Sequence, residues 1–314
     1  MGSGLAQAAD YTAYALTQLG EVYRRAAEFD VIHNHIDYFA FPFARLTRTA
    51  TVTTTHGRLD LPEVLRVYQP FPEQALVSIS RSQRAPLPNA NWIATVYNGV
   101  DLSAFKFYGE QGTYLAFVGR ISPEKRVDRA IEIAREVGMP LFIAAKVDPA
   151  DSGYYEHAIE PMIRASPNVE FVGEVNDTQK DNLLGGAYAS LFPVDWPEPF
   201  GLAMAESMAT GTPVIAYRAG SVPEVIEDGI TGFVCDNFRQ MLDAVPRVQY
   251  LNRIDCRRRV EHLYSAQSMA SSYEKAYSRI VSPTATTICG SEPEELSAVR
   301  SNGHRVGDKD TTKR

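Results

Sequence analysis

The chain has 314 residues, of which 45% are hydrophobic and 22% charged, so it is long enough for two globular domains. Its net charge of −7 argues against a general nucleic-acid surface, because no basic excess is present to neutralise phosphates. No apolar run has the length of a membrane span, the first residues lack a signal-peptide pattern, and Cys235, Cys256 and Cys289 are scattered, so we expect a cytoplasmic protein with reduced thiols.

The first hundred residues predict one helix followed by four short buried strands. The helix covers 11–29, and the strands are DVIHNHID (30–37), TATVTTTHG (49–57), ALVSIS (75–80) and WIATVYNGV (92–100). The turn NGVD and the segment KFYGEQG (106–112) then predict a hinge to the second half of the chain.

From about residue 110, short apolar strands alternate regularly with helical segments. The predicted strands are TYLAFVG, PLFIAAKV, NVEFVGEV, SLFPV, PVIAY and TGFVC, with helical patterns between them and two closing helices near 254–264 and 266–281. Continuous apolar strands separated by helices are typical of a parallel sheet covered on both faces. The fold class is therefore α/β and doubly wound, and we expect the tail 282–314, which has few apolar residues, to be disordered.

In open α/β sheets, ligands bind beyond the carboxyl ends of the strands, so two such domains facing each other would form a cleft. The polar residues expected there are His33, His35, His56, Arg120, Lys125, Lys146 and the loop of Glu198.

The segment FVGRISPEKR offers a phosphate-binding pattern. We expect a strand to end at Gly119, with Arg120, Lys125 and Arg126 clustered before a helix. Amide donors, the helix dipole and cations at such a junction suit a phosphate. The alternative is a solvated basic turn.

The stretch DWPEPFGLAMAESMATGTPVI places two carboxylates in apolar surroundings. If a helix begins near Phe200, Glu206 lies roughly 9 Å along it and about 10 Å from Glu198. Paired carboxylates of retaining glycosidases need about 5 Å, so a diphosphate-linked molecule with a polar group at each end fits the spacing better. The alternative is a core carboxylate at Glu206, bonded by backbone or arginine, and a solvated Glu198.

Three further patterns have mainly structural interpretations. His33, His35 and Asp37 alternate and so share a face, which allows a metal site, but we favour a polar cleft wall. Lys146 closes an apolar strand, and its expected position in the cleft makes it a possible ligand-binding residue. Trp196, between aspartate and proline, is expected to be a rigid packing element.

Several motifs resemble those of the retaining nucleotide-sugar glycosyltransferases of family 4, which have the GT-B fold. EPFGLAMAESMATGTPVI is similar to the family's E-x7-E signature, VGRISPEKRVDRAI to its diphosphate-binding segment, and VYNGVDLSAF to its passage between domains. DVIHNHID and TTTHGRLD resemble strand ends of its acceptor-side domain. The similarity extends over about 28–281.

The resemblance implies a role for each matching residue. Arg120 and Lys125 would bind the donor diphosphate, Glu206 the ribose hydroxyls and Glu198 the transferred sugar, while His56 would face the sugar from the other domain. The remaining predicted donor-binding residues are Phe200, Gly201, Leu202, Gly119, Lys146 and Val172, the last for the loop after NVEFVGEV that would meet the base. No metal or other cofactor is needed, because the two cations would stabilise the leaving diphosphate.

The resemblance also implies a domain plan. We expect a truncated acceptor-side domain at 1–108, a donor domain at 109–265, a helix at 266–281 that packs back on the first domain, and the tail. Family members begin with a strand and a Gly-rich loop, whereas this chain begins with a helix, so the N-terminal Rossmann-like domain is expected to be incomplete and to expose a sheet edge.

The predicted function is hexosyl transfer from a nucleotide diphosphate sugar to an acceptor hydroxyl with retention of configuration. The acceptor is left open as a sugar, a lipid or a small molecule, with peripheral membrane contact for a lipid and no nucleic-acid partner. Two alternatives stand beside it: a truncated module that binds a nucleotide sugar without turnover, and a nucleotide-sugar epimerase of similar fold.

Overall fold

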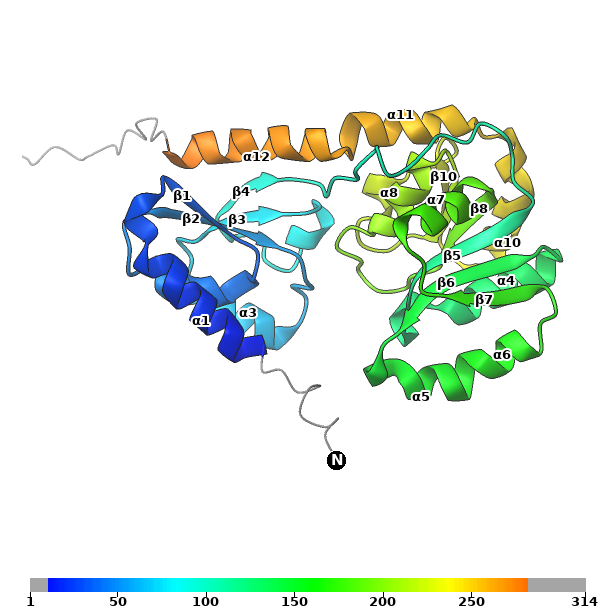
Figure 1. Cartoon of the computed structure of the whole chain (residues 1–314), viewed down its shortest axis with the longest axis horizontal. Helices are drawn as coiled ribbons and strands as arrows, with labels where there is room; N and C mark the ends of the chain where they lie inside the picture. The colour runs from blue at the N-terminus through cyan, green and yellow to red at the C-terminus, as the bar shows by residue number, and fades with distance from the viewer. Residues whose placement is uncertain (1–10, 282–314) are drawn as a thin grey trace, which may run out of the picture. The chain divides into compact units, whose positions relative to one another are not determined.

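Two parallel β-sheets organise residues 11–281, the part of the chain that this computed structural model describes (Figure 1). Both sheets belong to one compact unit that ends at residue 282. The prediction of an α/β fold built on parallel sheets is confirmed. The predicted domain boundaries remain predictions.

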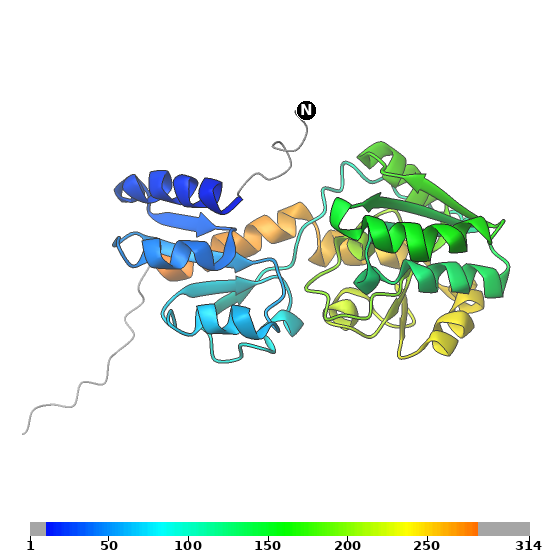
Figure 2. The ribbon, with the colours of Figure 1, turned by 90° about the horizontal axis from the view of Figure 1, so that it is seen from below.

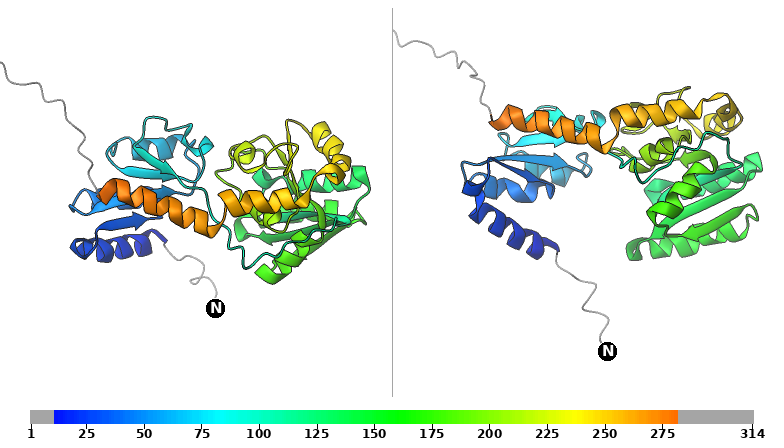
Figure 3. Two further views of the ribbon diagram at one scale, coloured as in Figure 1. Left: turned by 90° about the horizontal axis from the view of Figure 1, so that it is seen from above. Right: turned by 45° about the horizontal axis from the view of Figure 1, so that its top comes forward.

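The first sheet has four parallel strands in sequential order: β1 (Val31–Asn34), β2 (Ala50–Thr55), β3 (Ala75–Ser78) and β4 (Trp92–Thr95). Helix α12 (Ala266–Val281) covers one face of this sheet (Figure 3). There its tyrosines Tyr273 and Tyr277 pack against the cluster of Val52 and Val77. On the opposite face lie α1 (Tyr11–Arg24), α2 (Phe41–Ala44) and α3 (Pro62–Tyr68) (Figure 2).

The second sheet has six parallel strands in the order β10-β9-β8-β5-β6-β7. Their bounds are β5 (Tyr114–Ile121), β6 (Leu141–Val147), β7 (Val169–Gly173), β8 (Ala187–Phe192), β9 (Val214–Tyr217) and β10 (Gly232–Cys235). The strand order reverses between β5 and β8. Such a reversal opens a crevice at the carboxyl ends of the two strands, where ligands of doubly wound sheets bind.

Helices cover both faces of the second sheet because successive residues of each strand point to opposite sides. On β5, Leu115 and Phe117 join one buried cluster and Ala116 joins the other. The remaining helices are α4 (Val127–Val137), α5 (Ser152–Tyr154), α6 (Glu160–Arg164), α7 (Asp177–Gly185), α8 (Leu202–Ala209), α9 (Val222–Val225), α10 (Phe238–Ala244) and α11 (Arg253–Leu263). No helix among the described residues has the length and apolar composition that crossing a membrane requires.

Several predicted boundaries differ from the structure by a few residues. The strand expected to end at Gly119 continues to Ile121, because β6 pairs with β5 as far as Val147. The helix expected near Phe200 begins at Leu202, because Gly201 has left-handed backbone geometry at φ +78° and acts as its N-cap. Cys235 and Cys256 are free and buried, whereas Cys289 and the tail 282–314 lie outside the described residues.

Candidate functional site

The loops that follow β5 and β8 converge at the reversal of strand order. Lys125, in the turn after β5, donates to the Glu198 carboxylate in the loop after β8, and the two side chains are 19% and 11% exposed. The basic segment and the first carboxylate predicted from the sequence thus form one ion pair. An ammonium has three N–H donors, so Lys125 retains donors for a ligand while it holds Glu198.

Arg126 ties the same two loops together a second time. Its guanidinium bonds Asp128 at 3.0 Å and also pairs with Asp195, three residues before Glu198. Arg126 has φ +53°, a left-handed conformation that is strained for a residue with a side chain. These carboxylates raise the pKa of Arg126, mainly through its hydrogen bond to Asp128.

Glu206 is bonded by Lys180, a residue that the sequence analysis missed. The Lys180 ammonium on α7 lies 2.8 Å from Glu206 Oε1 on α8, and both side chains are less than one-fifth exposed. The pair accounts for a carboxylate in an otherwise apolar helix, because a buried charge needs a hydrogen-bonded partner. Twenty-six positions separate the two residues, so no local pattern predicts the contact.

Several other residues predicted to bind the sugar-nucleotide donor lie within strands β5, β6 and β7. Arg120 is half exposed, 3.0 Å from Glu124 and 3.9 Å from Asp151, and it stands opposite the exposed Lys146 in the pairing of β5 with β6. Gly119 lies inside β5. Val172 was expected to represent a loop, but it lies within β7.

The start of α8 is held by hydrogen bonds from the segment that precedes α9. The Ser221 N–H donates to the carbonyl of Glu198, and its hydroxyl donates to the carbonyl of Phe200, both at 2.9 Å. Phe200 is buried, whereas Leu202, the first residue of α8, is 45% exposed. The first amides of a helix have no partner within it, so this turn can donate to an anionic or hydroxyl ligand.

Three histidines lie together at the carboxyl ends of β1 and β2. His35 Nδ1 is 2.8 Å from His56 Nε2, and the rings of His33 and His35 are 4.0 Å apart between centroids. His33 bonds the Tyr277 hydroxyl at 2.7 Å and the Thr54 hydroxyl at 2.8 Å. The cluster connects the first sheet to α12.

Burial keeps these histidines neutral near pH 7. It lowers the pKa of His33 to about 4 and also lowers the pKa values of His35 and His56. Neutral imidazoles can each accept and donate one hydrogen bond, which suits contacts to hydroxyls.

The metal-site interpretation of His33, His35 and Asp37 gains no support. Within residues 11–281, no group of three histidine, cysteine or acidic side chains could hold a metal ion. Asp37 adopts φ +50° and starts a 3₁₀ turn, so its backbone leaves the strand instead of continuing the alternation. Burial raises the pKa of its carboxyl.

Trp196 has cations on its ring. The Arg58 guanidinium and the Lys125 ammonium each lie 5.2 Å from the ring centroid of Trp196. Its indole N–H is buried and has no hydrogen-bond partner among the described residues. A cavity of about 30 Å³ nearby is lined by residues of the segment 57–60 and by Pro197 and Pro199, so the Glu198 loop and the segment after His56 border the same space.

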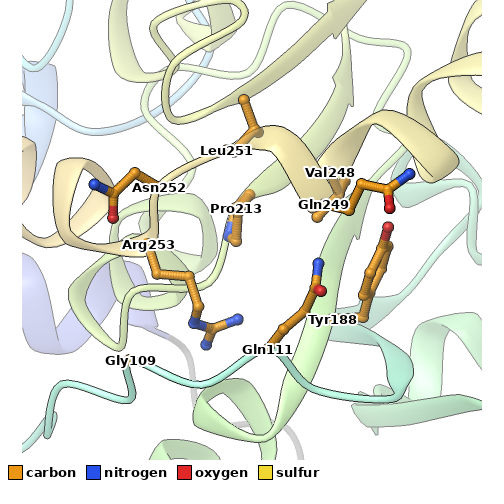
Figure 4. Close-up of a pocket in the computed structure, with 9 residues that line it drawn as sticks. All are labelled: Gly109, Gln111, Tyr188, Pro213, Val248, Gln249, Leu251, Asn252 and Arg253. Carbon is orange, nitrogen blue, oxygen red and sulfur yellow. The ribbon is translucent and has the colours of Figure 1, made fainter.

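A separate polar cavity of about 150 Å³ lies at the amino ends of the second sheet (Figure 4). Tyr188 at the start of β8 and Pro213 just before β9 line it, together with Gln111, Gln249 and Arg253. This position is opposite to the strand ends where doubly wound sheets bind ligands. The cavity is therefore not the candidate site.

The sequence profile of the family described as glycosyl transferases group 1 matches residues 104–261, half of the chain. Glycogen synthase of Mycobacterium tuberculosis is 30% identical over 157 residues, which are 47% of this chain and 37% of that protein. The D-inositol 3-phosphate glycosyltransferase of Mycolicibacterium smegmatis is 26% identical over 230 residues, covering 65% and 51%. The chain thus spans about half the length, or less, of these relatives.

Solved structures resemble most of the chain. AviGT4, a glycosyltransferase involved in avilamycin A biosynthesis, has a TM-score of 0.63 at 22% identity and covers 84% of this chain and 78% of its own. Anabaena Alr3699/HepE in complex with UDP and glucose has a TM-score of 0.71 at 16% identity, covering 83% and 81%. Likeness at such identities shows the fold.

Proposed function

The chain belongs to the glycosyl transferases group 1 family and has the GT-B fold, and on this basis we propose that it acts as a retaining hexosyltransferase, as in family 4. The hexosyl group passes from a nucleotide diphosphate sugar to an acceptor hydroxyl with retention of configuration. One observation carries the proposal: the Lys125–Glu198 pair joins the loops of β5 and β8 at the reversal of strand order. That pair offers a cation for a leaving diphosphate beside a carboxylate for sugar hydroxyls.

The chemistry follows from the charges at the site. Lys125 and Arg120 stabilise the negative charge that develops on the diphosphate as its bond to the sugar breaks. Glu198 accepts hydrogen bonds from the sugar, and Glu206 keeps one carboxylate oxygen for the ribose hydroxyls while Lys180 holds the other. The acceptor oxygen bonds to the anomeric carbon on the face that the diphosphate leaves, and its proton passes to the departing phosphate oxygen. No metal is required for these steps.

The test begins with binding of the sugar-nucleotide donor, because this step needs no acceptor. UDP-glucose, GDP-mannose and ADP-glucose are screened by thermal shift, since a ligand at a hundred times its dissociation constant stabilises a protein by about 2.7 kcal/mol. Release of the nucleoside diphosphate is then measured with the sugar nucleotide that stabilises the protein in the thermal-shift screen. The anomeric configuration of the product, read by NMR, decides retention.

Two substitutions and two matched controls connect activity to the site. We expect Lys125→Ala and Glu198→Gln to abolish nucleoside diphosphate release without unfolding the protein. The controls Lys275→Ala and Glu170→Gln remove the same charges at exposed positions and are expected to leave release unchanged. Normal rates in both site variants would refute the assignment. Donor binding without release would identify a binding module, and conversion of the donor to another sugar nucleotide without acceptor would identify an epimerase.

A further inference from the structure

Hydrogen bonds, joined by the backbone of residues 81–83, lead from the Glu198 loop to the segment on either side of His56. It begins at Ser221, whose N–H and hydroxyl bond the carbonyls of Glu198 and Phe200. Glu224 follows three residues later and donates its own N–H to the Ser221 carbonyl at 2.8 Å. The donor-side loop and the backbone of Glu224 are therefore rigidly connected.

The Glu224 carboxylate bridges from α9 to residues near the first sheet. Its two oxygens accept from the successive backbone N–H groups of Arg81 and Ser82, at 2.8 and 2.7 Å, and one of them also accepts from the Tyr97 hydroxyl at 2.9 Å. Two parallel acceptors facing two adjacent donors require a carboxylate, because an amide would turn an N–H toward an N–H.

Gln83 carries the connection to His56. Its side-chain amide donates to the carbonyls of Thr55 and Gly57, at 3.0 and 2.9 Å, which are the residues on either side of His56. The Gln83 carbonyl oxygen accepts from the N–H of Ile79 at 2.9 Å. Gln83 is buried, so its amide has one well-defined orientation.

The backbone carbonyl of Glu224 accepts from the Tyr264 hydroxyl at 2.6 Å and from the Arg259 guanidinium at 2.9 Å, so its backbone is held apart from the contacts of its carboxylate. The ring of Tyr97 also contacts the buried ring of Phe200, with centroids 6.2 Å apart. Tyr97 thus contacts both the Glu224 carboxylate and Phe200 in the Glu198 loop.

We propose that Glu224 is a positioning residue that, through Arg81, Ser82 and Gln83, sets the place of His56 relative to the Glu198 loop. The role in turnover rests on the proposed function, because it assumes that His56 faces the transferred sugar. The geometric part does not, since it concerns His56 in the ligand-free protein.

Glu224→Gln tests the proposal, with Glu227→Gln as the matched control. The Glu227 carboxylate bonds Arg259 at 2.6 Å and is half exposed, so the control removes the same charge three residues away without breaking the bridge. We expect Glu224→Gln to shift the imidazole NMR signals of His56, assigned from the His56→Ala spectrum, and to speed amide exchange at Arg81 and Ser82. Glu227→Gln should leave these signals unchanged.

A double-mutant cycle tests the role in turnover with the donor that supports release. Glu224→Gln should reduce kcat by about tenfold in the wild type but by less than about twofold in a His56→Ala background, because residues connected through one hydrogen-bond network couple whereas independent ones add. Effects that multiply, or His56 signals that do not move, would overturn the proposal. If Glu224→Gln does not fold, Tyr97→Phe, which removes one donor to the carboxylate, must shift the same signals by a smaller amount, and no shift overturns it.

The two proposals fail separately. If none of the three sugar nucleotides is turned over by the wild type, the proposed function fails, while the His56 signals of ligand-free Glu224→Gln still decide the positioning role.

Discussion

Replacing Gly220 with alanine inserts a methyl group against the backbone of the Glu198 loop. Gly220 has φ +52°, and a Cβ built there lies 2.3 Å from the Glu198 carbonyl oxygen and 2.4 Å from its nitrogen. Both are backbone atoms, so no side-chain rotation relieves the contact. The loop must move by about 1 Å to restore ordinary van der Waals separation.

Two effects of Gly220→Ala follow from this geometry. Left-handed strain for alanine costs about 1 kcal/mol, and overpacking adds about 1–3 kcal/mol, so the free energy of unfolding should fall by about 2–4 kcal/mol. Because the Glu198 carboxylate moves with its backbone, a displacement of about 1 Å should reduce turnover by on the order of 100-fold.

Gly229→Ala separates the strain from the clash. Gly229 has φ +76°, but a Cβ there meets nothing within 4 Å, so only the strain of about 1 kcal/mol is expected. Urea unfolding gives the stability of both variants, and nucleoside diphosphate release gives their activity. Equal activity losses in the two variants, or wild-type release by Gly220→Ala, would refute the reasoning.

Three further predictions concern other parts of the chain. Arg126→Gly relieves the strain at φ +53° but removes the bonds to Asp128 and Asp195, so we expect stability within about 1 kcal/mol of wild type in urea unfolding. We also expect weaker thermal stabilisation by whichever of the three sugar nucleotides stabilises the wild type; a loss of stability above about 3 kcal/mol would contradict this. Burial lowers the pKa of His33 to about 4, below the unfolded value near 6.5, so the unfolded state binds more protons and stability falls as the pH drops from about 6.5 toward 4. Urea unfolding midpoints at pH 7.5 and pH 5 check this, and His33→Gln should reduce the difference between the two midpoints. Arg253→Met leaves three backbone carbonyls and a hydroxyl without their buried donor, so the free energy of unfolding should fall by about 4 kcal/mol or more. The control Arg258→Met, at an exposed position, should change it by less than about 0.5 kcal/mol in the same assay.

The elements of the second half were predictable because their patterns are local. Val127, Ile131 and Ala134 recur at helical spacing and are buried on α4, and Gly138 ends that helix in a left-handed conformation. The end of β5 was not predictable from its own residues. It depends on how far β6 runs beside it, and Gly119 therefore lies inside a strand instead of at its end.

The partners of the site residues were predictable only in kind. An apolar helix with one carboxylate indicates that a partner must exist, but nothing near Glu206 points to Lys180, which lies on another helix. The sequence around Glu224 and Gln83 does not predict their contacts, since a glutamate on a short helix and a glutamine in a turn are ordinary surface patterns.

The sequence by itself determined the alternation of strands and helices, the parallel sheets and the residue types that follow the strands, because apolar periodicity and turn geometry act over a few neighbouring residues. Only the tertiary structure decided which lysine meets which glutamate and that Glu224 reaches the segment beside His56. Those contacts depend on strand order and on the packing of residues that lie between 26 and 143 positions apart, and local propensity carries no information about either.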